Sequence, residues 1–278
     1  MSTELSPIKF AFPENPTRVA IMGDWHADAY FAELIIEAAH NLGAEVIVHT
    51  GDFGFSYHND HHRDFISRVT RKLRKLDMVL VSVDGNHESF DYLNSLPLNA
   101  GGLRPVTKHI AHLPRGFRWK WWDTTWLALG GAHSVNSHLL TPGYDWFPEE
   151  LITWAQAEEV IAAGHADVMV THDVPNKVHI QGLPGASMFP AYQINAAEEH
   201  HALLGEVVDE VRPDWLFHGH MHKRHTAQRP LRDGGETTIV GLDCNVGRGW
   251  KDAMVLLDPL LMELLPLHEN IAFPVELD

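Results

Sequence analysis

Five short apolar runs in this sequence each end in a loop that carries aspartate, asparagine or histidine. Each run has the length and the β-branched, apolar composition of a buried strand. Helical patterns separate several of the runs, and alternation of strands with helices predicts an α/β fold with a largely parallel sheet in the first half of the chain. The expected strands are Arg18–Met22, Glu45–Thr50, Met78–Val83, Asp167–Thr171 and Trp215–His218. The expected helices are Ala29–Asn41, Asp60–Leu76, Pro148–Ala163 and Asn195–Val211.

Further apolar runs lack an intervening helix and are typical of hairpin or meander strands, so a second, mixed or antiparallel sheet is expected. No internal repeat and no linker rich in proline, glycine or serine divides the chain. We therefore expect a single domain over residues 1–278, with its core at about 17–267. These further runs are Gly116–Trp122, Thr125–Leu129, Thr237–Leu242 and Ala253–Leu257.

The charge of the chain excludes some classes of partner. Its 37 acidic and 21 basic residues give a formal net charge of −16, which repels a long polyanion, so no extended nucleic acid is expected as a partner. The longest apolar stretch, Met254–Leu267, is interrupted by Asp258, Pro259 and Glu263 and is too polar for a membrane span. The first residues lack the pattern of a signal peptide, and the lone Cys244 permits no internal disulfide. A cytoplasmic location is expected.

The polar residues gather where the expected strands end. In open α/β sheets, ligands bind beyond the carboxyl ends of the strands, so these loops are expected to meet at one place. The histidine count of 21 equals that of lysine and arginine together, which directs attention to metal ligands. The loops are Gly23-Asp24-Trp25-His26, Gly51-Asp52-Phe53-Gly54, Gly85-Asn86-His87-Glu88, Thr171-His172-Asp173 and Gly219-His220-Met221-His222.

The donor groups in these loops fit more than one ion. Residues two apart in an extended segment point to the same side, so such a pair offers two ligands to one centre. Seven groups exceed what one tetrahedral ion needs but suit two ions that share a bridging carboxylate. Imidazole, carboxylate and amide donors without thiolate suit Mn, Fe, Zn or Co and do not choose among them. The seven groups are Asp24, His26, Asp52, Asn86, His172, His220 and His222.

The order of these motifs resembles that of the calcineurin-like metallophosphoesterase superfamily. The resemblance rests on GDWH (23–26), GDFG (51–54), GNHE (85–88), THD (171–173) and GHMH (219–222), which occur in family order. It implies a four-layer α/β/β/α sandwich with two mixed sheets, in agreement with the strands and helices expected above.

The resemblance also implies the roles of the site residues. One metal ion would be held by Asp24, His26 and His222, and the other by Asn86, His172 and His220. Asp52 would bridge the two metals, and His87 would point toward the oxygen of the leaving group. Asp52 and His87 are therefore the expected catalytic residues.

The chemistry expected of such a centre is hydrolysis without a covalent enzyme intermediate. Two cations ~3.5–4 Å apart bind phosphoryl oxygens and hold a bridging hydroxide, because a metal lowers the pKa of bound water to roughly 7. The hydroxide attacks phosphorus in line, and a protonated His87 gives its proton to the departing alkoxide. The cofactors expected are two divalent transition-metal ions, with Mn preferred and Fe, Zn or Co as alternatives.

Several neighbouring residues have two interpretations. Trp25, Phe53, Phe55 and Tyr57 either form an apolar wall against which a nucleobase or aryl group stacks or pack against the sheet. His133, in another loop after an expected strand, either touches the substrate or is structural.

Three further features lie near the expected site in the sequence. His49 is expected to be a core histidine. Arg248 is a candidate phosphate contact, with a solvated arginine as the alternative. The segment His179–Gln193 is expected to form a loop or lid over the site.

The function expected is hydrolysis of small phosphodiesters, including cyclic or other nucleotides. The protein phosphatases of the superfamily carry GDxVDRG at the second motif, and Gly51–Ser56 lacks its second aspartate and its arginine, which speaks against phosphoprotein substrates. The alternatives are a nuclease or a phosphomonoesterase on the same centre, and a non-catalytic scaffold that binds a protein partner. The sequence does not indicate an oligomeric state.

Overall fold

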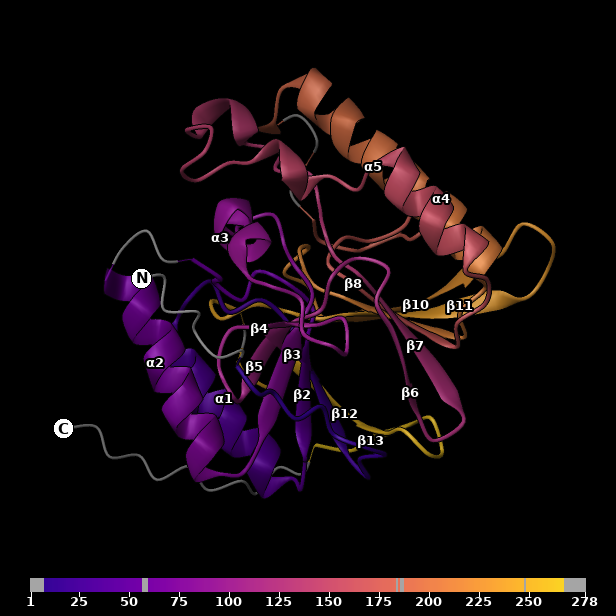
Figure 1. Ribbon diagram of the computed structural model, residues 1–278. Coiled ribbons are helices and arrows are strands. Elements are labelled where there is room, and N and C mark those ends of the chain that lie inside the picture. The colour runs from indigo at the N-terminus through magenta and orange to yellow at the C-terminus, as the bar shows by residue number, and fades with distance from the viewer. Residues whose placement is uncertain (1–7, 57–59, 184, 186–187, 248, 268–278) are drawn as a thin grey trace.

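Two mixed β-sheets pack face to face and carry helices on their outer faces in this computed structural model, which describes residues 8–56, 60–183, 185, 188–247 and 249–267. The first sheet has the order β13-β12-β1-β2-β3-β5-β4, and the second has the order β10-β11-β9-β8-β7-β6. Figure 1 labels most of these strands. The first sheet consists of β1 (Val19–Met22), β2 (Val46–His49), β3 (Val79–Ser82), β4 (Arg104–Pro105), β5 (Ile110–His112), β12 (Met254–Asp258) and β13 (Glu263–Leu265). The second consists of β6 (Arg118–Trp121), β7 (Thr124–Leu129), β8 (Val168–Thr171), β9 (Trp215–His218), β10 (His225–Pro230) and β11 (Glu236–Gly241).

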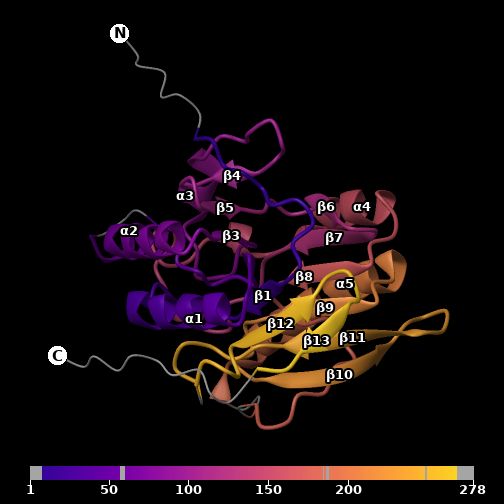
Figure 2. The same cartoon turned by 90° about the horizontal axis from the view of Figure 1, so that it is seen from below.

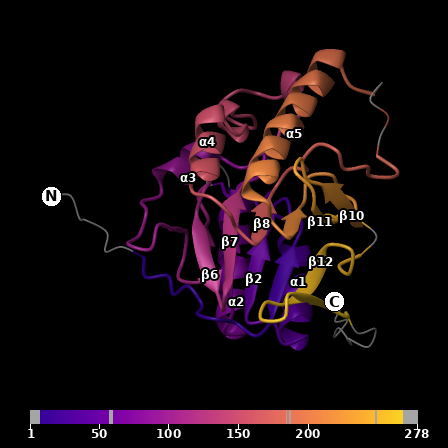
Figure 3. The same ribbon diagram turned by 90° about the vertical axis from the view of Figure 1, so that its right-hand side faces the viewer.

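The helices form the two outer layers (Figure 2). The pair α1 (Ala29–Asn41) and α2 (Asp60–Lys75) covers the first sheet, and the pair α4 (Trp154–Ala162) and α5 (Ala191–Val211) covers the second. Figure 3 shows α4 and α5 side by side over the second sheet. The short elements are α3 (Phe90–Ser95) and the 3₁₀ turns Ser137–Leu139 and Pro148–Glu150. The four-layer α/β/β/α sandwich is thereby confirmed.

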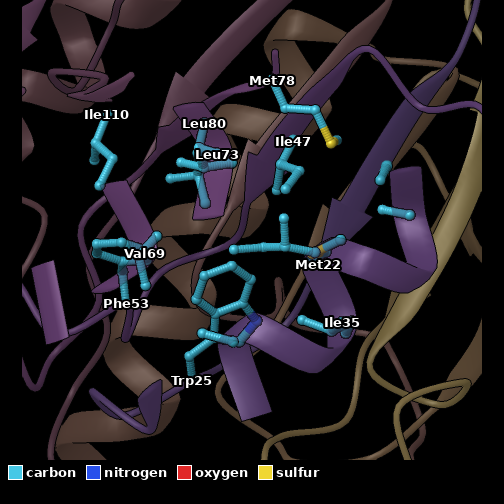
Figure 4. Close-up of a cluster of buried hydrophobic side chains, with 14 of the residues drawn as sticks. Met22, Trp25, Ile35, Ile47, Phe53, Val69, Leu73, Met78, Leu80 and Ile110 are labelled. Carbon is cyan, nitrogen blue, oxygen red and sulfur yellow. The ribbon is translucent and has the colours of Figure 1, made fainter. Parts of the chain in front are cut away.

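Three hydrophobic clusters hold the layers together. The first lies between α1, α2 and the first sheet and includes Ile35 and Val69 (Figure 4). The second lies between the two sheets and includes Trp126, and the third lies between the second sheet and helices α4 and α5 and includes Leu204 and Leu216. Because both faces of each sheet are covered at its centre, β1, β2 and β8 are buried along their whole length, which is why they stand out as apolar runs.

Local capping fixes where the helices begin. The side chain of Asp28 accepts hydrogen bonds from the backbone N–H groups of Tyr30 and Phe31, both at 3.0 Å, and starts α1 directly after the loop that follows β1. Thr153 and Gln156 form a capping box at the start of α4. This box divides the expected helix Pro148–Ala163 into a 3₁₀ turn and α4.

Two of the expected meander strands, β7 and β11, each have one antiparallel and one parallel neighbour. β7 is antiparallel to β6 but parallel to β8, and β11 is antiparallel to β10 but parallel to β9. The second sheet is therefore mixed, because α5 provides a crossover between the parallel strands β8 and β9. Among the described residues, no helix combines the length and the hydrophobicity that crossing a bilayer requires.

Candidate metal centre

The loops that leave β1, β2, β3, β8 and β9 bring the predicted ligands together at the carboxyl ends of the strands. His26, Asp52, His220 and His222 all have left-handed backbone, with φ between 47° and 58°. This conformation is uncommon for residues other than glycine and marks strained, functional loops. The loops therefore turn sharply enough for several side chains to point back at the same place.

Two glycines allow the loops to approach one another. A Cβ atom at Gly219 would lie 1.9 Å from Asp24 Oδ1, and a Cβ atom at Gly85 would lie 2.1 Å from Asp52 Oδ1. No other residue fits at either position, so the glycines of the GHMH and GNHE motifs make room for the two carboxylates.

Four of the predicted ligands form one group. Asp24, His26, Asp52 and His222 each offer a ligand atom, and these atoms lie within 4.8 Å of one another. His222 Nε2 lies 3.1 Å from Asp24 Oδ2, and His26 Nε2 lies 3.4 Å from Asp52 Oδ2. Asp24 Oδ1 is buried without a hydrogen-bond partner among the described residues. A buried carboxylate oxygen without a partner fits a cation that supplies the missing contact.

The other predicted ligands form a second group on the opposite side of Asp52. His172 Nε2 lies 3.0 Å from Asn86 Oδ1 and 3.4 Å from Asp52 Oδ1, and the rings of His172 and His220 are 5.1 Å apart between centroids. Asp52 thus directs Oδ2 toward His26 and Oδ1 toward His172. One carboxylate lies between two sets of donors, as a bridging ligand requires.

Hydrogen bonds from outside the motifs orient two of the imidazoles. His172 Nδ1 donates to the carbonyl oxygen of Thr50 at 2.8 Å, which leaves Nε2 as its ligand atom. His26 Nδ1 lies 2.9 Å from Asn245 Oδ1, and Asn245 Nδ2 donates to Asp28 Oδ2, so His26 Nε2 faces the site. No motif in the sequence marks Asn245, although it follows β11 at the same edge of the second sheet.

The aromatic residues beside the ligands face away from the site. Trp25 is fully buried, with its ring 4.7 Å from that of His49 and 5.4 Å from that of Phe53, inside the cluster of Figure 4. The prediction that Trp25 contacts substrate is wrong, because a residue between two ligands in the chain points into the core. Phe53 and Phe55 are buried in the same cluster, and Tyr57 lies outside the described residues. His49 is a core histidine, as expected.

The two other candidate substrate contacts have different outcomes. His133 is buried, and its Nε2 lies 2.7 Å from Gln193 Oε1. It connects the loop after β7 to α5, which favours the structural interpretation. Arg248 lies outside the described residues.

Comparison with protein families gives a match over residues 17–224, a segment that contains all seven predicted ligands and His87, to the family described as calcineurin-like phosphoesterase. The chain belongs to the calcineurin-like phosphoesterase family. Its members use a dinuclear metal centre and hydrolyse phosphoesters. Comparison with curated proteins gives no match.

Solved structures share the fold at low sequence identity. The protein TT1561 of Thermus thermophilus is 12% identical with a TM-score of 0.53, and the match covers 90% of this chain and 97% of that one. A dimetal phosphatase from Danio rerio is 11% identical with a TM-score of 0.51, and the match covers 87% of this chain and 92% of that one. At this identity the likeness shows the fold alone.

In this calcineurin-like phosphoesterase, a relay of hydrogen bonds sets the orientation of Asn86. Asn86 Nδ2 donates to Ser134 Oγ at 3.0 Å, and Ser134 Oγ donates to Glu150 Oε2 at 2.6 Å. Glu150 is fully buried and also accepts from the backbone N–H of Ser134. The amide nitrogen of Asn86 is thereby held away from the centre, so Oδ1 is presented to it. No motif in the sequence marks Ser134 or Glu150.

Replacing Ser134 with alanine is expected to weaken metal binding by the group that contains Asn86 about 10- to 100-fold, because the Asn86 amide loses its orienting partner. Calorimetric titration of metal-free protein with Mn²⁺ measures this as a weaker second binding step. Ser137→Ala, three residues away, removes a hydroxyl that accepts from Gln193 and is the matched control. Two unchanged binding steps in Ser134→Ala would contradict the role of the relay.

The carboxylates and imidazoles of the site shift one another's pKa values. Burial opposes ionisation of Asp52, but the imidazoles of His172 and His87 outweigh it and hold the pKa of Asp52 well below its usual range. Burial also works against the charged form of His26, yet Asp52 and Asp24 raise the pKa of His26 to about 9, and the same carboxylates raise the pKa of His172 to about 10. A cation that binds here replaces protons on these imidazoles, so metal affinity increases with pH.

His87 and its neighbour Glu88 have separate roles. The backbone N–H of His87 donates to Asp52 Oδ1 at 2.9 Å, and its exposed ring lies 5.8 Å from that of His26. Glu88 is buried and accepts from the backbone N–H groups of residues 53, 54 and 55. Burial and the Asp52 carboxylate raise the pKa of Glu88 to about 8. Glu88, which the sequence analysis left without a role, holds the loop that carries Asp52.

Two cavities open beside the centre and share Asp52 and His87. The larger has a volume of about 950 Å³ and is also lined by Asn86, His220 and residues from the segment after His172. The smaller has a volume of about 290 Å³ and is lined by polar residues that include Ser56 and Tyr144. Ile180, Leu183 and Phe189 line the larger cavity, so described residues of the segment His179–Gln193 border the site.

Proposed function

We propose that this chain is a dinuclear metal-dependent phosphodiesterase that acts on small phosphodiesters. The observation that carries the proposal is the position of the Asp52 carboxylate, with one oxygen directed at the group of His26 and the other at the group of His172. A carboxylate in this position serves two metals, and the donor set of imidazole, carboxylate and amide suits Mn, with Fe, Zn or Co as alternatives. Nucleotides are among the substrates that the proposal covers.

The residues of the chain divide the work of the reaction. A pair of divalent metals bound here supplies positive charge for the phosphoryl oxygens and water that is ionised at neutral pH. One metal would be held by Asp24, His26 and His222. The other would be held by Asn86, His172 and His220, and Asp52 would contact both. His87 stands beside the centre at the boundary of both cavities, from where its imidazole would give a proton to the oxygen of the leaving group.

Two features favour diesters. The two cavities share Asp52 and His87 in their linings, so each could take one ester group of a phosphodiester. Gly51–Ser56 lacks the second aspartate and the arginine that the phosphoprotein phosphatases of the superfamily carry. The net charge of −16 speaks against extended nucleic acid as substrate, and the single cysteine fits a reducing compartment such as the cytoplasm.

The proposal is tested by adding Mn²⁺, Zn²⁺ or Fe²⁺ separately to metal-free protein and measuring hydrolysis of phosphate esters by each sample. Bis(4-nitrophenyl) phosphate is expected to be cleaved with a higher kcat/KM than 4-nitrophenyl phosphate, and the active protein is expected to hold close to two metal ions per chain. Faster cleavage of the monoester would contradict the proposed preference. Loaded protein that cleaves neither ester would leave the non-catalytic scaffold as the better interpretation.

A further inference from the structure

The larger cavity has a polar lining near the predicted metal ligands and a mostly apolar lining farther from them. Asp52, Asn86 and His220 line the end at the metal centre. Beyond them most of the lining surface is apolar, and part of the wall comes from the segment after β8 and part from α5. Aliphatic residues of this wall include Val174, Val178, Ile180, Ile194, Ala197 and Met221.

Charged residues at the border of this cavity are largely compensated by partners within the protein. Lys177 Nζ lies 3.3 Å from Asp209 Oδ2. His201 Nε2 lies 3.0 Å from Asp173 Oδ1, and the nearby Glu198 adds to its negative surroundings. These pairs leave Lys223 as the one lysine or arginine of the described lining that forms no ion pair. A single such cation is little positive charge for the additional phosphate groups of a polyphosphate.

Among the described residues, the wall offers little surface on which a nucleobase could stack. Nucleobases are held by stacking on aromatic side chains, which contributes about 1–3 kcal/mol per base. Apart from histidines, Phe189 is the single aromatic residue among the described residues that line this cavity. The side chains that lie beside the ligands in sequence, Trp25 and Phe53, are buried in the core and offer no platform.

The smaller cavity differs in size and in chemistry. It is about 290 Å³ against about 950 Å³, and its lining includes Ser56, Ser89, Tyr144 and Asp145. An ester group on this side is therefore limited to a small, polar alcohol or a single ring.

We infer that the substrate is an amphiphilic phosphodiester, with one aliphatic alcohol that fills the larger cavity and one small alcohol that fits the smaller. The inference rests on the proposed function and narrows it, because it prefers an aliphatic arm to a nucleoside. Burial of each methylene of the alkyl group stabilises the bound ester. The value of kcat/KM therefore depends on the length of the alkyl group until the cavity is full.

The test uses 4-nitrophenyl phosphodiesters whose second ester group is methyl, butyl, octyl or thymidin-5′-yl. With metal-loaded protein, kcat/KM is expected to rise at least about tenfold from methyl to octyl, since each buried methylene contributes up to about fourfold. The octyl ester is expected to exceed the thymidine ester. Equal kcat/KM for methyl and octyl, or a preference for thymidine, would overturn the inference while leaving the phosphodiesterase proposal intact.

A variant tests whether the preference arises in this cavity. Ala197→Phe places a ring in the larger cavity and is expected to reduce the octyl-to-methyl ratio of kcat/KM at least about fivefold, because the ring occupies volume that the chain needs. Ala155→Phe adds the same ring at an exposed position of α4 and is expected to keep the ratio. An unchanged ratio in Ala197→Phe would assign the chain-length preference to another surface and refute the inference.

A binding measurement decides the inference without turnover. Calorimetry with octyl phosphate below its critical micelle concentration is expected to give a Kd at least about tenfold lower than with methyl phosphate, by the same methylene contribution. If no diester is hydrolysed, the proposed function fails, and this ratio still decides whether the cavity binds an aliphatic arm. Equal affinities would contradict it.

Discussion

Asp52→Asn is expected to lower kcat/KM for a small phosphodiester about a thousandfold or more and to reduce the metal content by at least one ion per chain. Asp52 faces both groups of predicted ligands, with 3.4 Å from Oδ2 to His26 Nε2 and 3.4 Å from Oδ1 to His172 Nε2. An amide offers one oxygen and no charge, so one metal loses a ligand and the pair loses its bridge. Bound metals supply several kcal/mol of transition-state stabilisation, and about 4 kcal/mol corresponds to a thousandfold in rate.

Steady-state kinetics and elemental analysis of the same protein sample measure both effects. Asp123→Asn is the matched control, because Asp123 is exposed in the turn between β6 and β7, at the other end of the strands. The control is expected to keep full activity and metal content. An Asp52→Asn protein that retains two metals and most of its activity would refute the bridging role.

Arg115→Ala is expected to reduce the free energy of unfolding by about 3–5 kcal/mol, because it leaves the buried carboxylate of Asp84 without its charged partner. Arg115 donates to Asp84 Oδ2 from Nε at 3.0 Å and from Nη2 at 2.7 Å, and His112 Nε2 lies 3.2 Å from Asp84 Oδ1. Arg115 also donates to the carbonyl oxygens of Glu150 and Leu151. The loss is a large fraction of the stability of a typical domain.

The charged form of Asp84 also fixes the pH range in which the pair contributes. Burial opposes ionisation, but Arg115 and His112 hold the pKa of Asp84 well below its usual range. A carboxyl group with a depressed pKa in the folded state stabilises the fold above its unfolded value of about 4, and this contribution is lost as the pH falls below it. The free energy of unfolding of Arg115→Ala is therefore expected to lie below that of the natural chain at neutral pH. This difference is expected to shrink in acid.

Urea denaturation measures this loss as a lower transition midpoint at an unchanged slope. Arg232→Ala is the contrast, because Arg232 pairs with Glu206 and Glu210 at the surface, where such pairs contribute about 0–1 kcal/mol. Similar midpoints for the two variants would show that the Asp84 carboxylate does not depend on its buried partner.

The sequence predicts the place of the site better than its details. The carboxyl ends of parallel strands lie at one edge of a sheet, and polar loops after β1, β2, β3, β8 and β9 therefore had to converge. The alternation of side chains within such a loop also explains Trp25, which faces the core because Asp24 and His26 face the site.

The partners of the ligands were beyond sequence reasoning. Asn245 lies 219 residues from His26 in the chain, and Ser134 lies 48 residues from Asn86. Neither pair shares a local pattern, because their contact depends on the packing of the two sheets and on the loops between them. Spacing gives the donors of a site, whereas tertiary structure gives their orientation.

The left-handed backbone at His26, Asp52, His220 and His222 has a consequence for engineering. Such a conformation in a residue with a Cβ atom is unfavourable by about 1–3 kcal/mol, and glycine relieves it. A screen that rewards heat resistance alone would therefore favour glycine at each of these positions and remove the very donors on which turnover depends. Substitutions meant to increase thermal stability without loss of activity belong in regions remote from the carboxyl ends of the strands.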